Sequence, residues 1–302
     1  FWSPILKTYR LLRELKCPSM DAFATRIRGI QPLKTFHGRP PENWAMVWLR
    51  GEWMRICDGM GGLPRADFDA LLKVFFQGDG FVPETGFFHE RGHPNSYDLF
   101  TRYFLLEIQS EALDGPIGDK AKSMLASGLK RSLALQLSDG SLPSAYRSSG
   151  QTWTDGVQIA YFDLASRLLP ETEKTTVEQA KNAAALAYAS FTRFFRADGS
   201  FSPVQNALPA ACRVGYEGYT ADANYSCLAL GFLADAVQRG FSSEISCKVP
   251  EATRRQVDGN PLYRAVLHKG PYSVHLNAFP STNYDGVGLN DLTFGPSRYL
   301  HW

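Results

Sequence analysis

Residues capable of acid–base chemistry crowd into the nine positions from His89 to Tyr97. Histidine and tyrosine side chains can exchange protons with a substrate, and an asparagine amide can hold a carboxylate or a hydroxyl group. We therefore predict four catalytic residues in this segment: His89, His93, Asn95 and Tyr97. The alternative interpretation is that these side chains cap and brace a long loop, because a helix is expected to begin at Ser96.

The same segment matches the zinc-protease pattern His-Glu-x-x-His between His89 and His93. That chemistry needs both imidazoles on one face of a continuous helix. Gly92 inside the pattern and Pro94 directly after it oppose a helix, so we predict no metal site. The glycine cluster at 59–62 lacks the preceding strand and the lysine of a phosphate-binding loop, so we expect no nucleotide chemistry and no cofactor.

A second segment, residues 141–155, carries side chains that suit a sugar acid. An aromatic wall and a fixed cation are typical of a pocket for an anionic sugar, and a carboxylate beside them can do acid–base work. We predict substrate binding by Tyr146, Arg147 and Trp153, and catalysis by Asp155. The alternative is structural: Asp155 caps a helix and Trp153 is a core residue.

A third segment, residues 201–225, is rich in tyrosine and amide side chains. Such loops suit polyhydroxylated ligands, because each phenol or amide offers both a donor and an acceptor. We predict the following site residues here: Arg213, Tyr216, Tyr219 and Asn224 for substrate binding, and Asp222 for catalysis. The alternative is that Asn224 and Tyr225 only pack into the helix that follows.

One repeated element positions all three segments, because an Asp-Gly pair precedes each of them, at Asp79, Asp139 and Asp198. The period of about sixty residues fits two helices with their connections, so each repeat is predicted to be an αα-hairpin. In a stack of hairpins, every second connection emerges on the same face. We therefore expect the three segments to share one face, where long loops typically carry a site.

Apolar residues three and four positions apart predict about eight helices. Their ranges are 5–15, 42–56, 66–76, 96–113, 119–137, 155–169, 175–195 and 222–239. Ser96, Asp155 and Asp222 suit the N-cap position, and glycines such as Gly140 and Gly199 suit left-handed helix ends. After about residue 260 the pattern changes, and alternating residues predict strands at 263–268 and 272–276. His275 in the second strand is expected to be structural, as a lone strand histidine usually is.

The bulk composition limits the class of protein. The 302 residues are 44% hydrophobic, enough for a large core, and the charges nearly balance at 32 basic and 30 acidic residues. Without a basic block we expect no nucleic-acid partner, and without an apolar run of about 18 residues we expect no membrane span. Five cysteines without a Cys-x-x-Cys pair predict neither a zinc cage nor a disulfide framework. The chain begins at Phe1 without Met, and a new strand pattern stops at Trp302, so we expect a fragment whose targeting segment is out of view.

The order of helical hairpins followed by strands resembles the (α/α)-toroid carbohydrate-active enzymes, which include heparinase-like and alginate-lyase-like polysaccharide lyases. The chain is also similar to a large microbial family, long catalogued as of unknown function, that includes β-glucuronidases. The similarity lies at Asn43-Trp44, Gly78-Asp79-Gly80-Phe81, Phe88-His89, Asn95-Ser96-Tyr97 and the Asp-Gly-Ser loop at 139–143. It covers about residues 40–240 in layout and is specific within 78–97.

This resemblance implies a fold and an activity. The fold would be mainly α, with an incomplete (α/α) toroid over residues 1–258 and the start of an antiparallel β-sandwich at 259–302. The activity would be cleavage of glycosidic bonds in glycans that contain uronic acid, and the partner an oligosaccharide or polysaccharide. A glucuronidase-like hydrolase, which needs two carboxylates, is favoured.

Two alternatives to hydrolysis stay open. A polysaccharide lyase needs a group that neutralises the uronate, a base and an acid. Asn95 or Arg147 can do the first task, and His89 or His93 together with Tyr97 can do the others. The second alternative is a non-catalytic protein whose aromatic loops only bind a glycan.

Overall fold

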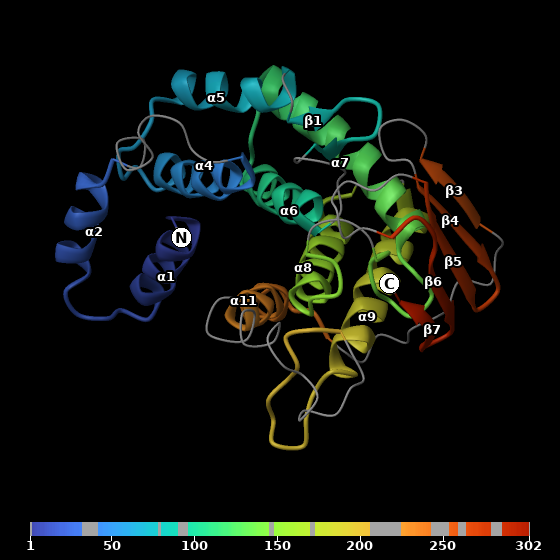
Figure 1. Cartoon of the computed structure of the whole chain (residues 1–302). Helices are drawn as coiled ribbons and strands as arrows, with labels where there is room; N and C mark the ends of the chain where they lie inside the picture. Colours follow the sequence, from blue (N-terminus) through green and yellow to red (C-terminus); the bar gives the residue numbers. More distant parts are fainter. Residues whose placement is uncertain are drawn as a thin grey trace. The chain divides into compact units, whose positions relative to one another are not determined.

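The computed structural model describes residues 2–31, 42–77, 80–89, 96–144, 148–169, 173–205, 225–242, 254–258, 264–278 and 286–301. This described chain is mainly α-helical (Figure 1). Its helices are α1 (Trp2–Glu14), α2 (Met20–Gly29), α4 (Glu42–Cys57), α5 (Arg65–Gln77), α6 (Ser96–Ser110), α7 (Gly115–Leu135), α8 (Trp153–Leu168), α9 (Lys174–Thr192) and α11 (Tyr225–Gln238). Its strands are β1 (Phe81–Val82), β2 (Phe87–Phe88), β3 (Arg254–Asp258), β4 (Arg264–Lys269), β5 (Tyr272–Asn277), β6 (Gly288–Phe294) and β7 (Ser297–His301).

The helices predicted from the apolar period are confirmed, with ends that differ by about four residues or fewer. Only α2 was not predicted. Its buried residues are Ala24 and Ile27 alone. The helical period is present in α2, where Phe23 and Ile27 lie four positions apart, but it extends over only ten residues.

Two compact units make up the chain: Phe1–Glu90 with Phe100–Ala126, and Arg91–Leu99 with Ser127–Trp302. The boundary between them passes through α6 and α7. The predicted division after residue 258 follows a different criterion, the change from helices to strands, and it stays a prediction.

Aromatic packing and ion pairs hold the first unit together. Trp53 of α4 lies against Phe68 of α5, with ring centroids 5.1 Å apart. Glu111, just after α6, accepts hydrogen bonds from Arg10 of α1 at 2.6 Å and from Arg50 of α4 at 2.5 Å. Because these charges satisfy one another, the cluster ties three helices together within this unit.

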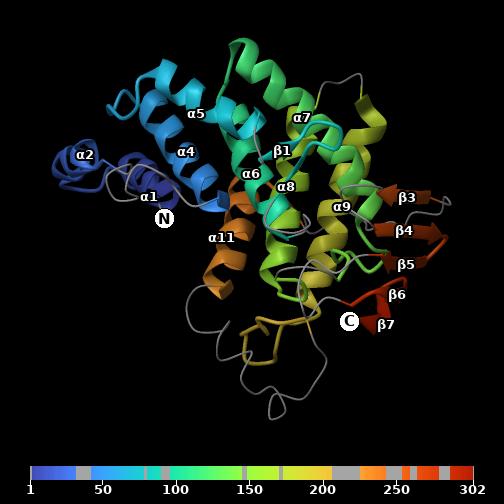
Figure 2. The same cartoon turned by 45° about the horizontal axis from the view of Figure 1, so that its top comes forward.

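Helix α8 is the centre of the second unit. Every residue from Trp153 to Ser166 is buried, and the helix packs against both α9 and α11 (Figures 1 and 2). Gly156 permits the close approach of α11, because a Cβ atom there would lie 2.8 Å from the Ala229 carbonyl oxygen. A helix that is buried all round serves as the core element of its unit.

The second and third Asp-Gly elements fold into the same turn. After α7, Ser141 donates its backbone N–H and its hydroxyl to the Asp139 carboxylate, at 3.1 and 2.5 Å. After α9, Ser200 makes the same two bonds to Asp198, at 2.9 and 2.7 Å. The intervening glycine has a φ of +87° in one turn and +84° in the other, which favours glycine. These glycines lie within the turns and not at the helix ends where we predicted them. In the first Asp-Gly pair, Asp79 lies outside the described residues.

Strands β3 to β7 form one antiparallel sheet in chain order, and both predicted strands are confirmed as β4 and β5. The buried face of this sheet is polar, with Ser273 and His275 on β5 and Asp291 on β6. The exposed face is apolar: Leu276 and Leu289 pair in register and are 39% and 48% exposed. The usual arrangement of a half-buried sheet, apolar inside and polar outside, is therefore inverted.

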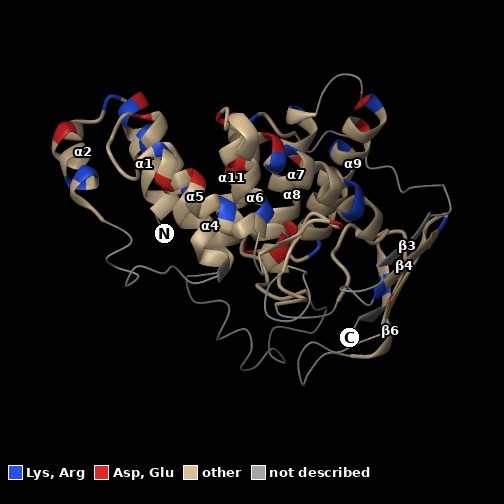
Figure 3. Ribbon diagram, turned by 90° about the horizontal axis from the view of Figure 1, so that it is seen from above, with Lys and Arg blue, Asp and Glu red and all other residues tan. Residues whose placement is uncertain are grey.

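Acidic and basic residues occur on the same helices, for example on α1 (Figure 3). Such mixing matches the near-neutral net charge of +2. Among the described helices, none combines the length and the apolar character that a membrane span requires.

Candidate functional site

One residue from each of the three predicted segments lies in a common cluster within the second unit. The Ser148 hydroxyl donates to the Tyr97 hydroxyl at 3.3 Å, and the Tyr225 hydroxyl lies 3.4 Å from the same oxygen. Tyr97 comes from the first loop segment, Ser148 from the second and Tyr225 from the end of the third. We call these three residues the hydroxyl cluster.

Backbone pairing joins the second and third loops beside this cluster. Gln151 forms an antiparallel bridge with Val204, and the Thr152 N–H donates to the Pro203 carbonyl at 3.0 Å. The Gln205 N–H donates to the Gly150 carbonyl at 2.7 Å. Because backbone bonds fix register, the two loops form one rigid support.

Trp153 packs against both tyrosines of the hydroxyl cluster. Its ring centroid lies 5.4 Å from that of Tyr97 and 6.2 Å from that of Tyr225. Its indole N–H donates to the Gln151 side-chain oxygen at 2.6 Å. The side chain is 0% exposed, so in this structure it supports the two tyrosines and offers no face to a substrate. The predicted binding role of Trp153 stays a prediction.

Ser148 holds a strained backbone conformation within the cluster. Its φ is +64°, in the left-handed region, which costs a non-glycine residue about 1–2 kcal/mol. Such strain persists only where the surrounding structure holds it, and it is concentrated at functional sites. Lys16, Ser19 and Ala112 hold the same left-handed conformation elsewhere in the chain, so this strain by itself does not mark a site.

Asp155 lies in the first turn of α8, two residues after Trp153. Its Oδ2 atom accepts hydrogen bonds from the Gln205 amide at 2.8 Å and the Ser190 hydroxyl at 3.3 Å, and Oδ1 accepts one from Gln158 at 3.4 Å. The helix begins two residues earlier and Thr152 precedes it, so the prediction that Asp155 is the N-cap was wrong. Complete burial raises the pKa of the Asp155 carboxyl to about 7, and the Gln205 hydrogen bond opposes this rise. Asp155 therefore carries a proton in part of the population near neutral pH.

A chain of polar contacts continues from Asp155 to the second Asp-Gly turn. The Arg193 guanidinium donates to the Ser190 hydroxyl at 2.8 Å and to the Asp139 carboxylate at 3.3 Å, and Arg298 of β7 donates to the same carboxylate at 3.0 Å. Burial alone would raise the pKa of Asp139, but Arg298 and Arg193 hold it below its ordinary value. Asp139 is thus a charged anchor, whereas Asp155 is a carboxyl that can hold a proton.

The other predicted site residues divide into two groups. His89 follows β2 in the first unit, is exposed, and its backbone N–H donates to the Gly80 carbonyl at 2.5 Å. The remaining predicted residues lie outside the described residues: His93, Asn95, Tyr146, Arg147, Arg213, Tyr216, Tyr219, Asp222 and Asn224. Their roles stay predictions.

Sequence reasoning missed Gln205, Ser190 and Ser148. Gln205 and Ser190 contact Asp155 from positions 50 and 35 residues away along the chain. No local pattern marks such partners. Ser148 follows the predicted residue Arg147, but a serine in a loop carries no signal for a left-handed backbone.

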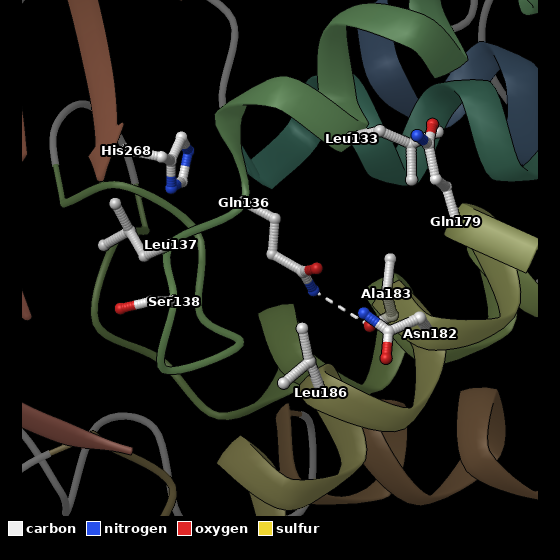
Figure 4. Close-up of a pocket in the computed structure, with 9 residues that line it drawn as sticks. All are labelled: Leu133, Gln136, Leu137, Ser138, Gln179, Asn182, Ala183, Leu186 and His268. Carbon is white, nitrogen blue, oxygen red and sulfur yellow. Dashed lines mark hydrogen bonds between the residues drawn. The ribbon is translucent and has the colours of Figure 1, made fainter. Parts of the chain in front are cut away.

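A separate hollow lies between the end of α7, α9 and β4 (Figure 4). The Gln136 carboxamide extends into it and donates to the Ala183 carbonyl at 2.9 Å. About 30 Å³ is open to the centres of water molecules there. That is room for about two waters, so this hollow does not fit a sugar ring.

Comparisons with protein-family models, curated proteins and solved structures each gave no match. Within the described residues, no three His, Cys, Asp or Glu side chains are grouped so that they could hold a metal ion.

Proposed function

We propose that the three-loop site binds and cleaves a glycan that contains uronic acid. The observation that carries this proposal is the hydroxyl cluster of Tyr97, Ser148 and Tyr225, which the loops of three successive repeats bring together above Trp153. Phenol hydroxyls on an aromatic support suit a polyhydroxylated ligand. The predicted Arg147 and Asn95 belong to the same loop segments and would neutralise the uronate.

We propose β-elimination as the chemistry, with the described Tyr97 and the predicted His93 in the two proton-transfer roles. A base removes the proton at C5 of the uronate, the electron pair forms the C4–C5 double bond, and the C4–O bond breaks. The leaving oxygen takes a proton from an acid. Tyr97 suits the acid role because its hydroxyl lies in the cluster, and the predicted His93 suits the base role.

Hydrolysis is the second candidate, and one observation favours it. Asp155 has a pKa raised by burial to about 7, and a carboxyl that keeps its proton can act as a general acid. Asp155 is completely buried below Trp153, however, and hydrolysis needs two carboxylates that flank the bond. We therefore place hydrolysis second.

We also propose that the repeated hairpins form part of an incomplete (α/α) toroid followed by the first sheet of a β-sandwich. Two observations support this architecture. The second and third repeats share the same Asp-Gly-Ser turn. The exposed face of the β3–β7 sheet is apolar, and a second sheet packed on it would bury residues such as Leu276 and Leu289.

Incubation with oligosaccharides that contain glucuronate tests the proposed activity. Elimination produces a conjugated double bond that absorbs ultraviolet light, and it also produces new reducing ends. Hydrolysis produces reducing ends without that absorbance. Binding without either product would exclude both enzymes and support the glycan-binding alternative.

A further inference from the structure

The polar face of the β3–β7 sheet lies against the second site loop. Buried polar groups need partners, because leaving one unpaired costs free energy. Ser273 accepts a hydrogen bond from the Ser138 N–H at 2.7 Å, and the Thr293 and Ser138 hydroxyls lie 2.7 Å apart. The sheet is thus hydrogen-bonded to the start of the loop that contains Ser148.

Asp291 on β6 binds the same loop further along the chain, at Ser144. Its Oδ2 atom accepts a hydrogen bond from the Ser144 N–H at 2.7 Å, and Oδ1 accepts one from the Ser144 hydroxyl at 2.6 Å. Asn290 adds a bond from its amide to the Ser144 carbonyl at 3.1 Å. Asp291 is 0% exposed, and bonds to a buried carboxylate are about twice as strong as neutral ones.

His275 completes this arrangement from the neighbouring strand. Its Nδ1 atom lies 2.9 Å from Oδ2 of Asp291, and the two residues are paired in register on β5 and β6. A carboxylate only accepts hydrogen bonds, so Nδ1 carries the hydrogen. The Nε2 atom is buried and has no hydrogen-bond partner in the described chain. Within the described residues, a proton added to Nε2 would have no acceptor.

We propose that Asp291 is a positioning residue that holds the second site loop through Ser144, and that His275 makes this hold sensitive to acid. Ser144 lies four residues before Ser148 of the hydroxyl cluster, so the bonds to Ser144 anchor this segment close to the cluster along the chain. The importance of these bonds for catalysis rests on the proposed function. The hydrogen bonds between Asp291 and Ser144 do not depend on the proposed function.

The charges around His275 give the direction of the acid effect. Burial lowers the pKa of the imidazole below its ordinary value; Asp291 on β6 opposes this, and Arg264 on β4 adds to it. The folded protein thus binds the proton less readily than the unfolded chain does. The contribution of neutral His275 to stability is complete above a pH of about 6.5 and falls as the pH drops below that value.

Amide hydrogen exchange at Ser144 tests this proposal without any substrate. In Asp291→Asn the amide group presents a donor to the Ser144 donors, so we expect Ser144 protection to fall by about 10- to 100-fold. Thr293→Val is the matched control, because it removes a hydroxyl from the same face of the sheet, two residues after Asp291. In the wild type this hydroxyl contacts Ser138. Ser144 protection should be unchanged in this control. Equal protection in Asp291→Asn and the wild type would overturn the positioning role.

The acid sensitivity is tested with His275→Asn, whose amide can still donate to Asp291 but does not titrate. After correction for intrinsic exchange, wild-type Ser144 should lose protection between a pH of about 8 and a pH of about 5, and the variant should not. The same loss in both proteins would overturn the role of His275. This variant also serves if Asp291→Asn does not fold. If no glycan is cleaved, the proposed function fails while these exchange results still stand.

Discussion

The Tyr97 hydroxyl is the single group on which the proposed chemistry most depends. Tyr97→Phe removes this oxygen but keeps the ring against Trp153. We expect glycan turnover to fall by about 10²- to 10⁴-fold, because a positioned acid contributes that much to a rate. The free energy of unfolding should change by about 1.5 kcal/mol or less, the value of one neutral hydrogen bond.

Steady-state kinetics and denaturant unfolding measure the two effects of Tyr97→Phe separately. Tyr103→Phe is the control, because the Tyr103 hydroxyl is buried and donates to Glu107 at 3.1 Å in the first unit. It should lose a similar amount of stability and keep its turnover. Wild-type turnover in Tyr97→Phe would move the site away from the hydroxyl cluster.

The two Asp-Gly-Ser turns are alike in backbone but differ in surroundings. A Cβ atom at Gly140 would lie 2.0 Å from the Leu186 carbonyl oxygen, whereas one at Gly199 would have no neighbour within 4 Å. Gly199→Ala should therefore cost only the left-handed strain, about 1–2 kcal/mol. Gly140→Ala should cost about 2 kcal/mol more, because the backbone of α9 must shift. Denaturant unfolding compares the variants, and equal losses would show that the turn at Gly140 tolerates a side chain.

The contact between α8 and α11 gives a second pair of glycine variants. Gly156→Ala places a Cβ atom 2.8 Å from the Ala229 carbonyl and should destabilise the second unit by about 1–3 kcal/mol. Gly231→Ala on the same α11 meets nothing within 4 Å and should stabilise it by about 0.5–1 kcal/mol. Thermal melting measures both. A stable Gly156→Ala would mean that the two helices can separate without loss.

The pH dependence of stability belongs to the molecule as a whole, because several buried groups contribute to it. The pKa of Asp155 is raised to about 7, so the folded protein holds a proton that the unfolded chain has lost. Stability from this group is therefore complete below a pH of about 4 and falls as the pH rises toward 7. His275 acts in the opposite direction below a pH of about 6.5, since its pKa is lowered.

Asp155→Asn isolates one of these contributions. The amide cannot ionise, so the variant should lose the fall in unfolding free energy between pH values of about 4 and 7, on the order of 3 kcal/mol. Unfolding by denaturant at a series of pH values measures it. A parallel pH profile in variant and wild type would show that Asp155 is ionised throughout this range.

The sequence alone predicted most of the helices and two of the strands. The apolar period predicted the helices, and alternation predicted β4 and β5, because both patterns depend on side chains a few residues apart. The Asp-Gly repeat predicted where three loops begin, and Tyr97, Trp153 and Asp155 were each chosen from it. Its turn is likewise local, since the Asp139 carboxylate is satisfied by Ser141, two residues away.

Only the tertiary structure decided how these residues are packed and which partners they have. Asp155 keeps a raised pKa because Gln205 and Ser190, from other loops and helices, enclose it completely. The Trp153 ring has no exposed face, because Tyr97 and Tyr225 pack against it. Burial and hydrogen-bond partners across 35 to 128 residues depend on packing between distant segments, and no short sequence pattern records that packing.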